Sequence, residues 1–183
     1  MTLITKLSIP QNINLQHFKN IIYFKGPYGL KKLIYLNYVL IFIKLNTLII
    51  QLKPIKKITK KAKAYYGMLS KIIQNIFYGL LYTYTQTLFL KGIGYKFIKE
   101  DKKLFIKLGY SHLLSLKIPK AITINIETQT KLIGLCIDKN VLSLFINRIR
   151  QFKLPNKYTG QGVLYPNEII KLKNGKAHKT KKK

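Results

Sequence analysis

Cysteine and acidic residues are scarce in this chain of 183 residues, and tryptophan is absent. Cys136 is the only cysteine, which excludes an intrachain disulfide and a zinc site built from several cysteines. Metal-dependent nucleases need several converging carboxylates, but this sequence has only five, scattered between residues 100 and 168: Glu100, Asp101, Glu127, Asp138 and Glu168. We therefore expect no catalytic residues, no metal site and no cofactor.

Arginine is also rare, because Arg148 and Arg150 are the only two, and nearly all of the positive charge comes from lysine. Together the 34 basic residues exceed the five acidic ones enough to give a formal net charge of +29. So much like charge would repel itself in a compact chain unless a polyanion neutralised it. Lysine contacts phosphate as a point charge, whereas arginine is preferred for reading bases. The lysine excess has two explanations that remain open, phosphate binding and codons rich in A and T.

The apolar content is ordinary at 48%, which is enough for one sizeable core or two small ones. Residues 33–52 form an apolar run as long as a membrane-spanning helix, but Lys44 interrupts it. β-Branched and aromatic residues dominate this run, so we interpret it as two buried strands that turn near residues 45–47 and expect no membrane insertion.

The hydrophobic pattern predicts short strands followed by a helix in the first half. Strands are expected at 13–18, 21–24, 30–36, 38–44 and 48–52, with a turn at 26–29. Apolar residues then recur at spacings of three and four over 59–78, which predicts a helix with Gly79 at its C-terminal cap.

The second half repeats this plan. Strands are expected at 85–98, 103–108, 113–118, 122–127 and 131–137, with Glu100 and Asp101 in a turn. A helix follows, with Asp138 as its N-cap and Pro155 as its stop. The prediction is an α+β protein of two similar domains, each an antiparallel sheet packed against one helix. The domains span 1–80 and 81–170, and a basic tail without fixed structure spans 171–183.

Two short motifs resemble parts of enzyme active sites, but neither is complete. Gly92 and Gly94 begin a dinucleotide-binding fingerprint, yet Phe97 stands where its third glycine belongs and both flanks are strand-like. Ser111 and His112 are adjacent as in some hydrolases, but no Gly-x-Ser-x-Gly elbow is present. We interpret the first as a kinked strand and the second as a structural or RNA-contacting turn.

The stretch LPNKYTGQGVLY at 154–165 is the strongest candidate for RNA binding. Gly160 and Gly162 allow close backbone approach, Lys157 is placed for phosphate, and Tyr158 and Tyr165 for sugar or base faces. The alternative is an ordinary glycine-containing turn before a last strand.

Together with three other motifs, this stretch resembles the family of the sixth protein of the large ribosomal subunit, in its bacterial and organellar form. The resemblance is carried by LKGIGYK at 90–96, LGYSH at 108–112, TQT at 128–130 and PNKYTGQGV at 155–163. Thr159 and Gln161 replace lysines that are usual in the family. The match is nearly full length, strong from residue 80 onward and weak between 35 and 59.

The resemblance implies two α+β domains and binding to large-subunit rRNA near the sarcin-ricin loop and the factor-binding region, mostly through the second domain and the tail. Neighbouring large-subunit proteins would be the other partners, and a homo-oligomer is not expected. The expected RNA-binding residues are Lys91, Gly92, Gly94, Tyr95, Ser111, His112, Arg148, Arg150, Lys153, Lys157, Tyr158, Thr159, Gly160, Gln161, Gly162, Tyr165, Lys171, Lys173, Lys176, Lys179, Lys181, Lys182 and Lys183.

The opening residues MTLITKLSIPQ carry neither a secretion signal nor a transit peptide. If the protein works in an organelle, we therefore expect it to be synthesised there, and codons rich in A and T, the second explanation of the lysine excess, would agree with this. We expect a mitochondrial matrix ribosome because the first half is diverged, with a plastid as the alternative. An organellar RNA-processing or other nucleic-acid-binding protein is the competing function.

Overall fold

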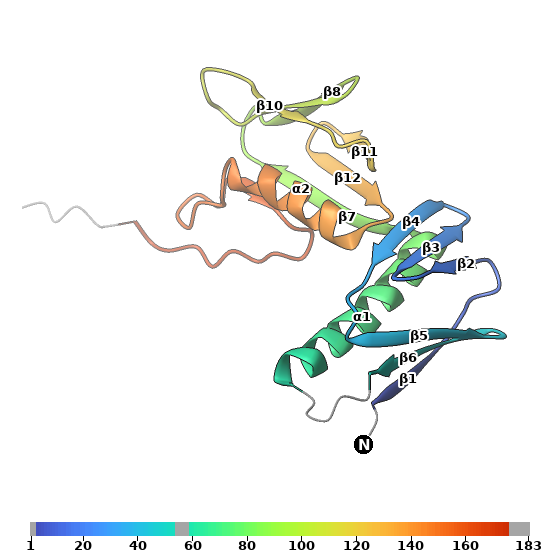
Figure 1. Ribbon diagram of the computed structural model, residues 1–183. Coiled ribbons are helices and arrows are strands. Elements are labelled where there is room, and N and C mark those ends of the chain that lie inside the picture. Colours follow the sequence, from blue (N-terminus) through green and yellow to red (C-terminus); the bar gives the residue numbers. More distant parts are fainter. Residues whose placement is uncertain (1–2, 54–58, 176–183) are drawn as a thin grey trace, which may run out of the picture. The chain divides into compact units, whose positions relative to one another are not determined.

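The computed structural model describes residues 3–53 and 59–175 (Figure 1). The chain divides into two compact units. The first runs from the N-terminus to Tyr84 and includes Cys136–Lys139, and the second contains Thr85–Leu135 and continues from Asn140. Strands paired mostly antiparallel, with two helices, confirm the predicted α+β class. No helix in the described ranges is long and apolar enough to cross a membrane.

Two three-stranded sheets and the helix α1 (Lys60–Tyr82) make up the first unit. The sheet orders are β1-β6-β5 and β2-β3-β4, and their strands are β1 (Ile4–Ser8), β2 (Asn14–Phe18), β3 (Ile21–Gly26), β4 (Gly29–Ile34), β5 (Val39–Lys44) and β6 (Thr47–Leu52). The apolar run at 33–52 therefore forms strands, as predicted. Strand β1 was not predicted, because its pairing partner β6 lies about forty residues away in sequence.

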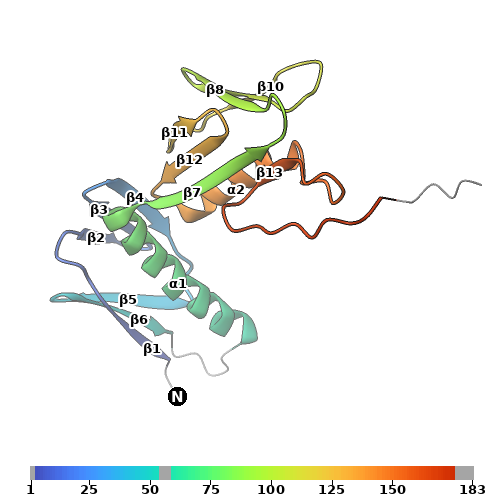
Figure 2. The same cartoon turned by 180° about the vertical axis from the view of Figure 1, so that it is seen from behind.

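The core of the first unit lies between α1 and the sheets (Figures 1 and 2). Leu69, Ile73 and Leu80 of α1 are almost completely buried, as are Ile22 and Phe24 of β3. Complete burial of an aliphatic or phenylalanine side chain contributes about 1.5–3 kcal/mol, so this interface accounts for much of the unit's stability.

Helix α1 begins as predicted but ends later. The hydroxyl of Thr59 accepts a hydrogen bond from the Ala62 N–H at 3.2 Å, which caps the N-terminus. The predicted C-cap at Gly79 is wrong, since the helix continues to Tyr82 and Thr83 takes the positive φ of 56°. Gly79 is instead needed for close packing, because a Cβ there would lie 2.1 Å from the Ile137 carbonyl oxygen.

The second unit contains the sheets β10-β9-β8 and β11-β12-β7-β13 and the helix α2 (Lys139–Gln151). Its strands are β7 (Tyr84–Lys91), β8 (Lys96–Glu100), β9 (Lys103–Lys107), β10 (Leu114–Lys117), β11 (Ile122–Thr128), β12 (Lys131–Cys136) and β13 (Gly162–Leu164). The single strand predicted at 85–98 is wrong, because a turn at 92–95 divides it between two sheets.

Helix α2 lies across β7 and β12 (Figure 2). Gly134 of β12 permits this approach, since a Cβ there would lie 3.0 Å from Leu142 and 3.3 Å from Ile146, both fully buried on α2. Asp138 precedes the helix as predicted, but its carboxylate forms an ion pair with Lys31. The helix positions the C-terminal segment 152–175, where most of the predicted site residues lie.

Candidate nucleic-acid interface

Three turns of the second unit that were singled out in the sequence lie next to one another. They are the turn at 91–95, the turn at 109–112 and the loop at 154–162, and we call their exposed side chains the three-turn surface. Strand pairing places Gly162 opposite Lys91, which joins the loop to the first turn. Lys153, which directly precedes the loop, joins it to the second turn through its contacts with Leu108 and Tyr110.

The ammonium group of Lys153 contacts both the turn at 91–95 and the turn at 109–112 and so links them to the loop. It donates a hydrogen bond to the Leu108 carbonyl at 2.7 Å and lies 4.9 Å and 4.8 Å from the ring centroids of Tyr95 and Tyr110. The Tyr110 hydroxyl in turn donates to the Phe152 carbonyl at 3.1 Å. Lys153 and the buried Tyr95 were predicted to contact RNA, but these contacts give both a role in holding the turns together.

Asn156 closes the loop at 154–162. Its backbone N–H donates to the Gln161 carbonyl at 2.9 Å, and its carbonyl accepts from the Gly160 N–H at 2.8 Å. Its side-chain oxygen also accepts from the Tyr158 N–H at 2.8 Å. Sequence reasoning had not given Asn156 a role, although asparagine commonly bonds to its own backbone two residues on.

The two loop glycines are internal. Gly160 has φ of 69°, and its N–H donates to the Asn156 carbonyl, so in this structure the N–H serves the loop itself. Gly162 has φ of 150°, and a Cβ there would lie 2.7 Å from the Pro155 Cα. Both glycines therefore shape the loop and its junction with β13.

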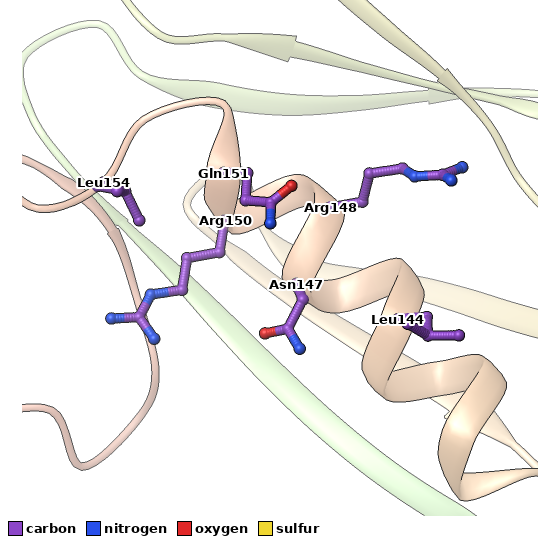
Figure 3. A pocket seen from close by; sticks show the side chains of 6 residues that line it. All are labelled: Leu144, Asn147, Arg148, Arg150, Gln151 and Leu154. Carbon is purple, nitrogen blue, oxygen red and sulfur yellow. The ribbon is translucent and has the colours of Figure 1, made fainter.

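Arg148 and Arg150 come from the last turn of α2 and project in different directions (Figure 3). Arg150 forms a 2.5 Å ion pair with Glu168, and its guanidinium lies 4.8 Å from the Tyr165 ring centroid. The Tyr165 hydroxyl donates to Asn147 at 2.6 Å. Arg150 and Tyr165 thus brace the segment that follows β13, whereas Arg148 is exposed.

The remaining predicted residues are mostly at the surface. Gly92 and Gln161 are half-buried, and the exposed ones are Lys91, Gly94, Ser111, His112, Lys157, Tyr158, Thr159, Lys171 and Lys173. The Lys173 N–H donates to the Lys157 carbonyl at 2.8 Å, which holds the start of the predicted tail against the loop. Lys176, Lys179, Lys181, Lys182 and Lys183 lie outside the described residues.

Across residues 3–53 and 59–175, no three His, Cys, Asp or Glu side chains gather as a metal-binding group. Burial raises the pKa of the Cys136 thiol, so this group is held in its neutral and unreactive form at neutral pH.

Comparison with known proteins places these turns in one family. Residues 91–166, which include all three turns, match the family described as Ribosomal protein L6. The large ribosomal subunit protein uL6 of Caldicellulosiruptor saccharolyticus is 34% identical over 178 residues, which cover 97% of this chain and 96% of that protein. The uL6 protein of Mycoplasmoides gallisepticum is 31% identical over 176 residues, and that of Chlorobium phaeobacteroides is 37% identical over 119 residues.

For the Mycoplasmoides protein the match covers 96% of both chains, and for the Chlorobium protein it covers 65% of this chain and 66% of the relative. The resemblance inferred from the motifs is confirmed. Because more than 30% identity extends over nearly the whole of both sequences, the chain belongs to the ribosomal protein L6 family.

Proposed function

We propose that the chain is a structural constituent of the large ribosomal subunit, present as a single copy that binds large-subunit rRNA and contacts neighbouring ribosomal proteins. The observation that carries this proposal is the nearly full-length similarity to large ribosomal subunit proteins. The L6 family is structural and non-enzymatic. The scarcity of carboxylates and the charge of +29 support a polyanionic partner independently.

The three-turn surface is the proposed rRNA contact. Lys91 and Lys157 supply exposed ammonium groups, and Tyr158 and His112 supply exposed rings. Lys173 lies outside the three turns but is held against the loop by its backbone bond to Lys157, and it adds a further exposed ammonium group. Lysine can neutralise phosphates, and aromatic rings stack on unpaired bases.

No carboxylate lies within the three turns, which increases their attraction for phosphate. In this unit Glu127 is paired with Lys131, and Glu168 with Arg150. Glu100 ends β8, and Asp101 follows it in the turn between β8 and β9.

The finer placement rests on the family resemblance. It supports contact near the sarcin-ricin loop and the factor-binding region, made by the second unit together with the lysines of the tail. The sequence composition supports an organelle-encoded chain, and we propose the mitochondrial ribosome as its location. Fractionation of mitochondria and plastids, followed by immunodetection of the chain, tests that location.

Co-sedimentation at raised salt tests the function. We expect the chain to remain on large subunits, whereas an RNA-processing factor held by charge alone would be released.

The double variant Lys157→Gln with Tyr158→Ala should reduce incorporation into subunits. Lys71→Gln with Tyr82→Ala, which changes two exposed residues of α1, serves as the matched control. Release of the native chain, or equal loss in both variants, would contradict the proposal.

A further inference from the structure

The sheet β2-β3-β4 of the first unit has one face in the core and one face in solvent. Ile22 and Phe24 point inward and are fully buried, and the Phe24 ring meets the Phe77 ring of α1 edge-on at 5.8 Å. The alternate positions point the other way. We call these nine side chains the outer face: Asn14, Gln16, Phe18, Ile21, Tyr23, Lys25, Leu30, Lys32 and Ile34.

Large apolar side chains are unusually exposed on the outer face. Phe18 is 61% exposed, Leu30 70% and Ile34 66%, and Tyr23 is 37% exposed at the centre of the sheet. Single exposed apolar residues are common on proteins, but a contiguous group marks a contact surface.

The strand register arranges the outer face in three rows across the sheet. These rows are Phe18–Ile21–Ile34, Gln16–Tyr23–Lys32 and Asn14–Lys25–Leu30. Neighbouring strands lie about 4.8 Å apart, so the members of each row touch. The apolar row therefore borders the middle row, in which Gln16 and Lys32 flank Tyr23. The third row lies on the far side of the middle row and adds Lys25 two residues beyond Tyr23 on β3.

The two aromatic rings of the outer face are held in place by contacts with each other and with Lys32. Phe18 and Tyr23 meet edge-on, with centroids 6.4 Å apart and an interplanar angle of 72°. The Lys32 ammonium lies 5.8 Å from the Tyr23 centroid. A flat ligand could take the place of this ammonium on the ring, and Lys32 would then be free to reach an anion beside it.

Charge identifies the class of partner. The first unit contains a single carboxylate, Asp138, and this group is occupied by its ion pair with Lys31. Lys31 lies between Leu30 and Lys32 on β4 and so points away from the outer face. Lys25 and Lys32 therefore act without a neutralising neighbour on the outer face, which favours an anionic partner with flat apolar groups.

We propose that the outer face binds an unpaired stretch of RNA. Bases stack on Tyr23 and Phe18, Ile21 and Ile34 extend the apolar floor, and Lys25 and Lys32 contact the phosphates. Base-paired RNA does not suit this face, since stacking on a side chain requires a base free of its neighbours. This site is separate from the three-turn surface and goes beyond the proposed function.

Fluorescence anisotropy with the full chain tests the proposal, using a labelled single-stranded oligoribonucleotide and the duplex of the same sequence. Tyr23→Leu keeps the apolar bulk but removes the ring, and we expect it to weaken single-strand binding by about tenfold. Phe42→Leu, at a residue that is 50% exposed on the other sheet, is the matched control and should bind as the native chain does.

Both variants are also measured in the Lys157→Gln, Tyr158→Ala background, which separates loss at the outer face from loss at the three-turn surface. Oligonucleotides containing 4-thiouridine should crosslink to β2 or β3, and Tyr23→Leu should abolish that crosslink. Circular dichroism verifies that each variant is folded.

Unchanged affinity of Tyr23→Leu in both backgrounds would overturn the proposal, as would equal loss in Phe42→Leu. A photoreactive side chain at position 23 that crosslinks to a protein rather than to rRNA in assembled subunits would also overturn it. None of these results would affect the proposed function, which depends on incorporation into subunits.

Discussion

Individual basic residues divide into those that hold the fold and those that face solvent. Lys31, Lys131 and Arg150 are paired with carboxylates, and Lys99 and Lys153 donate to backbone carbonyls. The count of 34 basic residues thus overstates the number of cationic groups available to a partner. Composition alone cannot make this distinction, because it depends on contacts between residues far apart in sequence.

Lys153 and Lys157 offer a matched comparison of these two roles. We expect Lys153→Met to lower the free energy of unfolding by about 1–2 kcal/mol, because it removes a charge-assisted hydrogen bond and two cation–π contacts. Lys157→Met, at an exposed position, should leave it nearly unchanged. Urea unfolding followed by circular dichroism measures both. Equal stability of the two variants would mean that the ammonium of Lys153 does not hold the turns.

At the scale of elements, α1 carries two glycines with opposite roles. Gly67 has no neighbouring atom within 4 Å of an added Cβ, whereas Gly79 faces the Ile137 carbonyl. Gly67→Ala should stabilise the protein by about 0.5–1 kcal/mol, since alanine loses less backbone entropy in a helix. Gly79→Ala should destabilise it, because the backbone of Ile137 would have to move. Thermal unfolding distinguishes them, and two shifts of the same sign would contradict this packing.

The same helix shows where sequence reasoning succeeds and fails. The apolar spacing predicted its existence and its start at Thr59, because both are local properties. Its end was misplaced, since a glycine that caps a helix and a glycine required by a neighbouring segment look alike in sequence. The division of 85–98 into β7 and β8 was missed for a related reason, because nothing local shows that Lys91 pairs with Gly162.

The candidate site follows the same pattern. The motifs at 91–95, 109–112 and 155–163 were singled out one by one, and their adjacency in the folded unit was not predicted, because it depends on contacts between residues far apart in sequence. The sequence could not show which side chains would turn inward. Tyr95, Lys153 and Arg150 have the residue types of RNA contacts, yet each is occupied by protein partners.

For the whole molecule, affinity for RNA should depend strongly on salt. Removal of residues 176–183 deletes five lysines, which are Lys176, Lys179, Lys181, Lys182 and Lys183. If all five neutralise phosphates, the slope of log K against log salt should fall in magnitude by about 3.5 for single-stranded RNA. Anisotropy titrations over a range of salt concentrations measure the slope. An unchanged slope would show that these lysines do not contact RNA.

The pairing of β13 with β7 also determines the order of events during synthesis. Strand β7 lies between β12 and β13, and the register joins Lys91, Leu90 and Phe89 to Gly162, Val163 and Leu164. A nascent chain that has not yet released residue 164 therefore keeps one edge of β7 open, with unpaired backbone groups beside apolar side chains. Completion of this sheet must wait until residues 162–164 have left the ribosome, about seventy residues after β7 itself was made. Prematurely terminated chains would carry that open edge permanently, which would mark them for aggregation or proteolysis before they could compete for a place in the ribosome.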